Sequence, residues 1–250
     1  MSMYRALIIF GLGLVSAAAV LVGLAFLIGG EYGLLVIPVV VLVVSALAYV
    51  ALKGGRRRRS LLPAIIPALL VLFFTLPSVG FAFGHFDSVF DFGPTVLGVL
   101  GGLTTLLGVV VAFVTESGGR AANATTPTHW RAFTGVAAAL GAICVLSAIL
   151  TIAGRESVSA EEREGATVVR MKQLEFEPEV LEVGTGEIRI VLENDDPTVH
   201  TFTIDELDVD EDVNGGSEAL IEFEAPAAGS YEITCEVPGH EAMTGTIEVR

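Results

Sequence analysis

The C-terminal stretch Tyr231–Val249 reads YEITCEVPGHEAMTGTIEV, and it decides how the rest of the chain is interpreted. Its two ends alternate apolar and polar residues, which is the pattern of half-buried β-strands. Between these ends, Cys235, His240 and Met243 fall within nine residues. A thiol, an imidazole and a thioether are three of the four ligands of a trigonal copper site. The stretch therefore raises two questions: on which side of a membrane it lies, and whether a second histidine is available.

Composition divides the chain into two parts. The 250 residues are 52% hydrophobic with a mean hydropathy of +0.70, which indicates membrane spans. Residues 1–154 carry a net charge of +4 and residues 155–250 a net charge of −19. Such an acidic part disfavours binding to nucleic acid. Because Lys53 and Lys172 are the only lysines, we interpret the acidity as halophile-like salt adaptation rather than as a docking surface for a basic partner.

Five stretches lack charged residues for long enough to cross a bilayer, which takes about 20 residues. They predict a transmembrane α-helical bundle over residues 1–154. The stretches lie between Arg5 and Glu31, Glu31 and Lys53, Ser60 and Asp87, Asp91 and Glu116, and Arg131 and Arg155. The first is longer than the apolar part of a signal peptide, so we expect a retained span.

Small residues and prolines within these stretches predict two local features. Prolines favour a kink in the third helix, and they stand at Pro63, Pro67 and Pro77. Small residues four apart favour close packing of the fifth helix, and they pair Gly135 with Ala139 and Ala137 with Gly141.

The loops predict the topology of the bundle. Two of them carry Lys and Arg, Lys53–Arg59 and Glu116–Arg131, and the positive-inside rule places these in the cytoplasm. The N-terminus is then cytoplasmic, and everything after Arg155 lies outside a prokaryotic plasma membrane. His85 lies at the outer end of the third stretch and His129 in a cytoplasmic loop, so a haem held by two histidines within the spans is not expected. An anchoring or docking role is favoured, and a quinone or lipid site without ionisable groups stays open.

The part outside the membrane predicts a second fold class. An acidic linker covers residues 155–165, and seven short alternating runs follow over residues 166–250. Gly, Pro, Asn and Asp separate the runs. Short alternating strands between such turns indicate an all-β, antiparallel Greek-key sandwich.

Cysteine counting and the histidines complete the candidate site. Cys144 lies in the middle of the last span, so it cannot reach Cys235 to form a disulfide. An unpaired thiol outside the cell is a liability unless it is used or protected. A His2Cys site with an axial Met needs one more histidine. The only one left after residue 155 is His200, at the start of the run HTFTI. We therefore predict one copper ion held by His200, Cys235, His240 and Met243.

Two polar residues are expected to support this site. Thr201 follows His200 directly, and Asn194 precedes it by six residues. We predict that both form hydrogen bonds to the ligand-bearing segments.

Both ligand segments resemble those of a known family. HTFTI is similar to the first-ligand strand of the cupredoxins, the blue type 1 copper domains of plastocyanin, azurin and halocyanin. YEITCEVPGHEAMTGTIEV resembles their closing loop with its Cys, His and Met. The resemblance covers roughly the C-terminal third. It implies that His200, Cys235 and His240 are equatorial ligands and Met243 the axial one. Two residues separate His240 from Met243, fewer than in most azurin-like loops but similar to amicyanin.

These features favour a membrane-anchored blue copper protein that carries single electrons without substrate turnover. A binuclear copper centre would need a second loop cysteine, and multicopper oxidases need more than four histidines. The resemblance implies electron exchange through His240 with a cytochrome or terminal oxidase complex, across a rim of Pro238, Gly239 and Ala242. The acidic run Asp205–Val213 either steers such a partner or is a solvated loop. The alternatives are a copper-binding or assembly module and an accessory subunit of a respiratory complex.

Overall fold

The computed structural model describes residues 2–54, 58–117, 127–225 and 227–250. Parts of both basic loops, residues 55–57 and 118–126, lie outside the described residues. Two compact units divide the chain. The helical unit is Met1–Phe26 with Tyr32–Ser147, and the β unit is Leu27–Glu31 with Ala148–Arg250. The predicted borders at 154 and 165 stay predictions.

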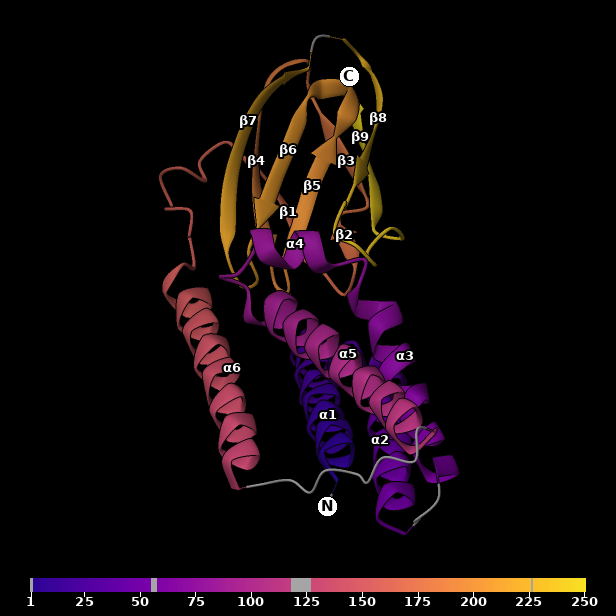
Figure 1. The fold of residues 1–250 in the computed structure, drawn as a ribbon. Coiled ribbons are helices and arrows are strands. Elements are labelled where there is room, and N and C mark those ends of the chain that lie inside the picture. Colours follow the sequence, from indigo (N-terminus) through magenta and orange to yellow (C-terminus); the bar gives the residue numbers. More distant parts are fainter. Residues whose placement is uncertain (1, 55–57, 118–126, 226) are drawn as a thin grey trace. The chain divides into compact units, whose positions relative to one another are not determined.

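Apolar helices form nearly all of the N-terminal region (Figure 1). They are α1 Met3–Gly29, η1 Tyr32–Leu35, α2 Val36–Gly54, η2 Arg58–Ala64, α3 Ile65–Thr75, α4 Val79–Gly84, α5 Val89–Ser117 and α6 Pro127–Ala153. Among the described residues, four helical segments are long and apolar enough to cross a membrane: Met3–Gly29, Tyr32–Gly54, Val89–Thr115 and Arg131–Ala153. The prediction of an N-terminal region with several long apolar helices is confirmed, and that these helices cross a membrane stays a prediction.

The third predicted span differs from the other four. A 3-10 helix, η2, leads into α3, which has only 11 residues, and the short α4 follows after a break. Pro77 lies in that break and has no backbone N–H to donate, so the helix ends before it. Prolines therefore interrupt this span rather than only kinking it.

Close helix packing occurs at glycines of α5 rather than in α6. A Cβ on Gly101 would lie 2.8 Å from the carbonyl oxygen of Gly11 in α1, so only glycine allows this approach. A Cβ on Gly135 or Gly141 of α6 would meet no atom within 4 Å. The prediction that the small residues of α6 pack closely is therefore wrong. Leu140 of α6 is instead buried, in a cluster with Leu14 of α1.

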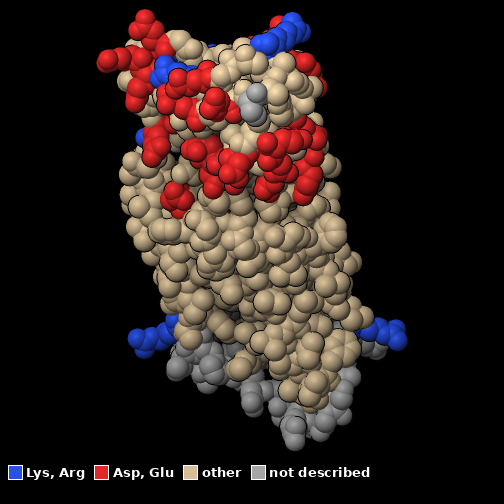
Figure 2. Space-filling model, turned by 90° about the horizontal axis from the view of Figure 1, so that it is seen from above, with Lys and Arg blue, Asp and Glu red and all other residues tan. Residues whose placement is uncertain are grey.

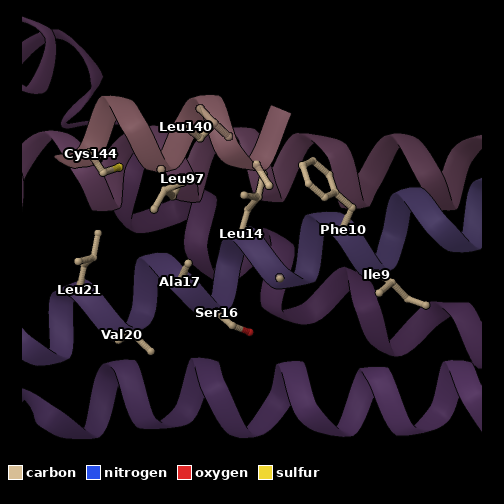
Figure 3. Close-up of a pocket in the computed structure, with 13 residues that line it drawn as sticks. Ile9, Phe10, Leu14, Ser16, Ala17, Val20, Leu21, Leu97, Leu140 and Cys144 are labelled. Atoms are coloured by element: carbon tan, nitrogen blue, oxygen red, sulfur yellow. The ribbon is translucent and has the colours of Figure 1, made fainter. Parts of the chain in front are cut away.

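An apolar groove of about 780 Å³ runs between α1, α5 and α6 (Figure 3). Its only side-chain heteroatoms belong to Ser16 and Cys144. The Ser16 hydroxyl donates to the Leu12 carbonyl oxygen at 2.9 Å, so its hydrogen bond is already satisfied. No charged side chain lines the groove, in keeping with the absence of ionisable groups within the spans.

Nine strands build the β unit as two packed sheets (Figure 1). They are β1 Thr167–Lys172, β2 Glu175–Glu177, β3 Val180–Val183, β4 Gly186–Asn194, β5 His200–Ile204, β6 Val209–Val213, β7 Glu218–Ala225, β8 Gly229–Thr234 and β9 Thr244–Val249, with a 3-10 turn η3 at Asp205–Leu207. The sheet orders are β2-β1-β4-β7 and β3-β9-β8-β5-β6.

The β-sandwich is confirmed, but its sheets are mixed rather than purely antiparallel. β1 runs parallel to β4, and β3 runs parallel to β9, while the other pairs are antiparallel. Both parallel pairs join strands that are distant in the sequence. Ile188, Ile190 and Leu192 point into the core, as their alternation predicts, and each is at most 4% exposed.

The predicted linker lies against the β-sandwich. Arg163 forms ion pairs with Glu193 of β4 at 2.6 Å and with Glu218 of β7 at 2.5 Å. The hydrogen bonds from Arg163 and Arg170 hold the pKa of Glu193 below its ordinary value. The backbone N–H of Val158 also donates to Glu218 at 2.8 Å. Residues 155–165 are therefore fastened to one sheet.

Replacing Arg163 by Ala should release this segment. We expect a loss of about 1 kcal/mol in stability, because the pairs are only partly buried, and faster proteolysis within residues 155–165. Thermal unfolding and limited proteolysis measure the two effects. Arg250→Ala is the matched control, because its pair with Glu182 is exposed on both sides. Equal effects of the two substitutions would contradict a fastened linker.

Candidate metal centre

The order of strands in one sheet brings the predicted ligands to one end of the sandwich. His200 is the first residue of β5, and Cys235 directly follows β8. His240 and Met243 lie in the loop that leads into β9. Since β8 lies between β5 and β9 in the sheet, its end stands next to the start of both neighbours. All four predicted side chains therefore come from adjacent strand ends.

Three donor atoms form a triangle of the right size for one metal ion. The Cys235 Sγ lies 3.7 Å from the His200 Nδ1 and 3.8 Å from the His240 Nδ1. The two Nδ1 atoms are 3.2 Å apart. Bonds of about 2.3 Å to sulfur and about 2.0 Å to nitrogen, at trigonal angles, would place sulfur and nitrogen about 3.7 Å apart and the nitrogens about 3.5 Å apart. The observed triangle matches a trigonal centre with one ion in its plane.

Backbone hydrogen bonds fix the loop between Cys235 and Met243. The His240 N–H donates to the Val237 carbonyl oxygen at 2.9 Å, and the Met243 N–H donates to the His240 carbonyl oxygen at 2.8 Å. The Cys235 N–H closes the loop on the Met243 carbonyl oxygen at 3.1 Å. Gly239 has a φ of +96°, which glycine adopts without strain. These turns bring Met243 beside Cys235 despite the short gap, and its side chain is 1% exposed.

Asp196 contacts the Nε2 of His200, the ring nitrogen that is not part of the triangle. This contact was not predicted from the sequence. The Asp196 Oδ2 lies 3.0 Å from the His200 Nε2, and both side chains are almost fully buried. The Gln173 N–H donates to the same oxygen at 2.8 Å. A carboxylate behind a ligating imidazole fixes the ring so that the other nitrogen faces the metal. Its signal in the sequence was its place four residues before His200, in the segment NDDPTVH.

The predicted support from Asn194 and Thr201 is confirmed. The Asn194 side-chain amide donates to the carbonyl oxygens of Thr198 and Val213, both at 2.8 Å. The Thr201 backbone N–H points at the Cys235 Sγ, 3.5 Å away, and its hydroxyl accepts from the Glu236 N–H at 2.7 Å. Asn194 therefore holds the segment before His200, and Thr201 ties that segment to the cysteine.

The thiol and the imidazole of the centre stabilise each other's charged forms. Burial alone would raise the pKa of Cys235, but hydrogen bonds with His200 and His240 lower it to about 6. Burial opposes the charged form of His200, yet Asp196 and Cys235 raise its pKa to about 9. The metal-free site therefore holds a thiolate near neutral pH, which is the form that binds metals.

Exposure differs sharply between the two histidines. His200 is fully buried, whereas His240 is only partly buried. Around His240, Gly239 and Ala242 are exposed and Pro238 is partly buried, as expected for a surface rim. Of the three donors in the triangle, His240 is the one that reaches the surface.

Titration of the metal-free protein in a Cys144→Ser background tests these charges. The ultraviolet absorbance of the Cys235 thiolate should rise with a midpoint near pH 6. In His200→Ala it should move towards the value of about 8.5 for a free thiol, because an imidazolium partner is lost. A midpoint above 8 in the parent protein would contradict the proximity of thiol and imidazoles.

Comparison with known proteins agrees with this geometry. Residues 142–249 match the family model described as a cupredoxin-like domain. No curated protein sequence matches the chain. Similar solved structures include reduced auracyanin from Roseiflexus castenholzii, with 20% identity, a TM-score of 0.31, and coverage of 34% of this chain and 99% of that chain. An oxidised amicyanin variant has 20% identity and a TM-score of 0.31, with coverage of 38% and 92%.

A copper-containing nitrite reductase from Thermus scotoductus SA-01 is also similar, with 23% identity and a TM-score of 0.28. The match covers 34% of this chain but only 22% of that enzyme. By the family model, residues 142–249 form a cupredoxin-like domain. The arrangement of its His200, Cys235, His240 and Met243 is consistent with one type 1 copper ion.

Proposed function

We propose that the protein is a membrane-anchored blue copper protein that carries single electrons at the outer face of a prokaryotic plasma membrane. The observation that carries this proposal is the triangle of Cys235 Sγ and the Nδ1 atoms of His200 and His240 inside a cupredoxin-like domain. In this proposal these three residues and Met243 would hold one copper ion. Copper, when bound, supplies a one-electron couple between Cu(I) and Cu(II).

The residues of the chain suit electron transfer better than substrate turnover. Strand ends and backbone hydrogen bonds hold the donors, so the ligands need not rearrange when the charge of the ion changes. Three donors and a buried Met243 leave no open position for a substrate. His240 offers the route to the surface, and Pro238 and Ala242 form a small rim for transient docking. We therefore propose a carrier without its own enzymatic activity.

The helical unit supports the proposed topology of a membrane anchor. The Arg5 guanidinium donates to the Leu52 carbonyl oxygen at 2.6 Å, so the start of α1 and the end of α2 lie together. Arg5 and Lys53 thus lie at the same end of the helices. By the positive-inside rule this end faces the cytoplasm, and residues 166–250 are extracytoplasmic. The proposed organisation is a membrane domain at 1–154, a linker at 155–165 and a copper domain at 166–250.

A redox protein such as a cytochrome or a terminal oxidase complex is the proposed partner. Red acidic side chains crowd one part of the surface in Figure 2, while a broad area shows neither red nor blue. On η3 and β6, Asp205, Glu206 and Asp210 are exposed acids. Such a field attracts basic partners and repels nucleic acid, and it weakens with added salt.

Copper loading of the purified full-length protein tests the proposal. With Cu(II), we expect an intense absorption towards the red end of the visible spectrum, which reductant bleaches and oxidant restores. Cys235→Ser should abolish the band, because the blue absorption requires the thiolate ligand, whereas Cys144→Ser should keep it. A protein that binds only Cu(I) and never turns blue would indicate a copper-assembly module instead. Co-purification with a respiratory complex would favour an accessory subunit.

A second substitution tests the axial position. Met243→Leu should keep the colour but shift the reduction potential upwards, because the weak axial donor that helps to stabilise Cu(II) is lost. Electrochemical titration of the absorption band measures the shift. Met171→Leu is the control, because Met171 is equally buried but lies on β1. Unchanged potentials in both variants would show that Met243 is not a ligand.

A further inference from the structure

A short segment from the N-terminal region, the last turn of α1 and the two residues after it, belongs to the β unit. Leu27–Glu31 forms one compact unit with Ala148–Arg250. A Cβ on Gly29 would lie 3.2 Å from the Asp196 Oδ1. Gly30 has a φ of +83°, and a Cβ there would lie 2.6 Å from the Gln173 Nε2. Gly29 lets the backbone of this segment approach Asp196, and Gly30 lets it approach Gln173, whose backbone N–H donates to Asp196.

Glu31, the last residue of this segment, carries a carboxylate that is electrostatically coupled to Asp196, His200 and His240. Its Oε1 is buried and has no hydrogen-bond partner among the described residues, and the same is true of the Asp196 Oδ1. Burial and the negative charge of Asp196 raise the pKa of Glu31, while His240 and His200 oppose this rise. Glu31 is therefore electrostatically coupled to both histidines of the triangle, and no Lys or Arg is among the groups that shift its pKa.

We propose that Glu31 is an electrostatic tuning residue that lowers the reduction potential of the copper centre. This inference rests on the proposed function, because it needs a copper ion in the site. A copper ion held by one thiolate carries one positive charge more when oxidised than when reduced. A carboxylate nearby in a poorly hydrated place stabilises the more positive state. The effect acts through space, so Glu31 is not a ligand and does not shape the triangle.

The location of Glu31 makes this role specific to the full chain. The segment is not part of the strands that carry the ligands, and its Gly29 lies against Asp196. Acidic residues on the strands are mostly exposed, so water screens their charges. One partly buried charge of the segment can therefore outweigh several charges on the surface.

The test is the reduction potential of full-length Glu31→Gln, titrated through the blue absorption band at pH 8. We expect the equilibrium constant for one-electron reduction to rise at least threefold, which is about 28 mV since tenfold corresponds to 59 mV. The absorption and electron paramagnetic resonance spectra should stay unchanged, because the ligands stay in place. Glu31→Asp should remain near the native potential, since it keeps the charge.

Glu224→Gln is the matched control. Glu224 is exposed and lies near the last residue of β7, whereas the first residue of this strand, Glu218, lies beside the Asn194 segment. A shift in Glu31→Gln no larger than in this control would overturn the inference, and so would an equal shift in Glu31→Asp. In both cases a blue native protein would leave the proposed function standing. A native protein that never turns blue would overturn both the proposed function and the tuning role.

Discussion

The rest of the structure depends on the convergence of one sulfur and two nitrogen atoms at the end of one sheet. A buried thiol and two imidazoles within 4 Å of each other are unusual in a hydrophobic core, because burying ionisable groups costs free energy. Their arrangement fits a preorganised metal site. The order β9-β8-β5 creates the arrangement, and Asp196, Asn194 and Thr201 hold it.

The hydrogen bonds around the centre divide it into a fixed side and an open side. His200 is fully buried and contacts Asp196, and the Leu27–Glu31 segment packs against Asp196 in turn. His240 reaches the surface between exposed neighbours. We propose that charges near His200 and Asp196 help to set the reduction potential, and that the electron is exchanged at His240. The two properties can then change independently, because different residues control them.

Much of the fold and most of the site could be predicted from local patterns. Cys235, His240 and Met243 are close in the sequence, and counting histidines led to His200. Features that depend on contacts between distant segments were missed. The parallel pairing of β1 with β4 and the approach of Glu31 to the centre leave no local signal. At Pro77 the signal was present, but a proline does not show whether a helix will kink or end.

X-ray absorption at the copper edge of the oxidised full-length protein tests the central claim most directly. We predict one copper ion per chain with one sulfur at short distance and two imidazole nitrogens in its inner shell. In Cys235→Ser the short sulfur contribution should disappear. An inner shell of nitrogen and oxygen alone in the native protein, or two copper ions per chain, would contradict the trigonal centre formed by His200, Cys235 and His240.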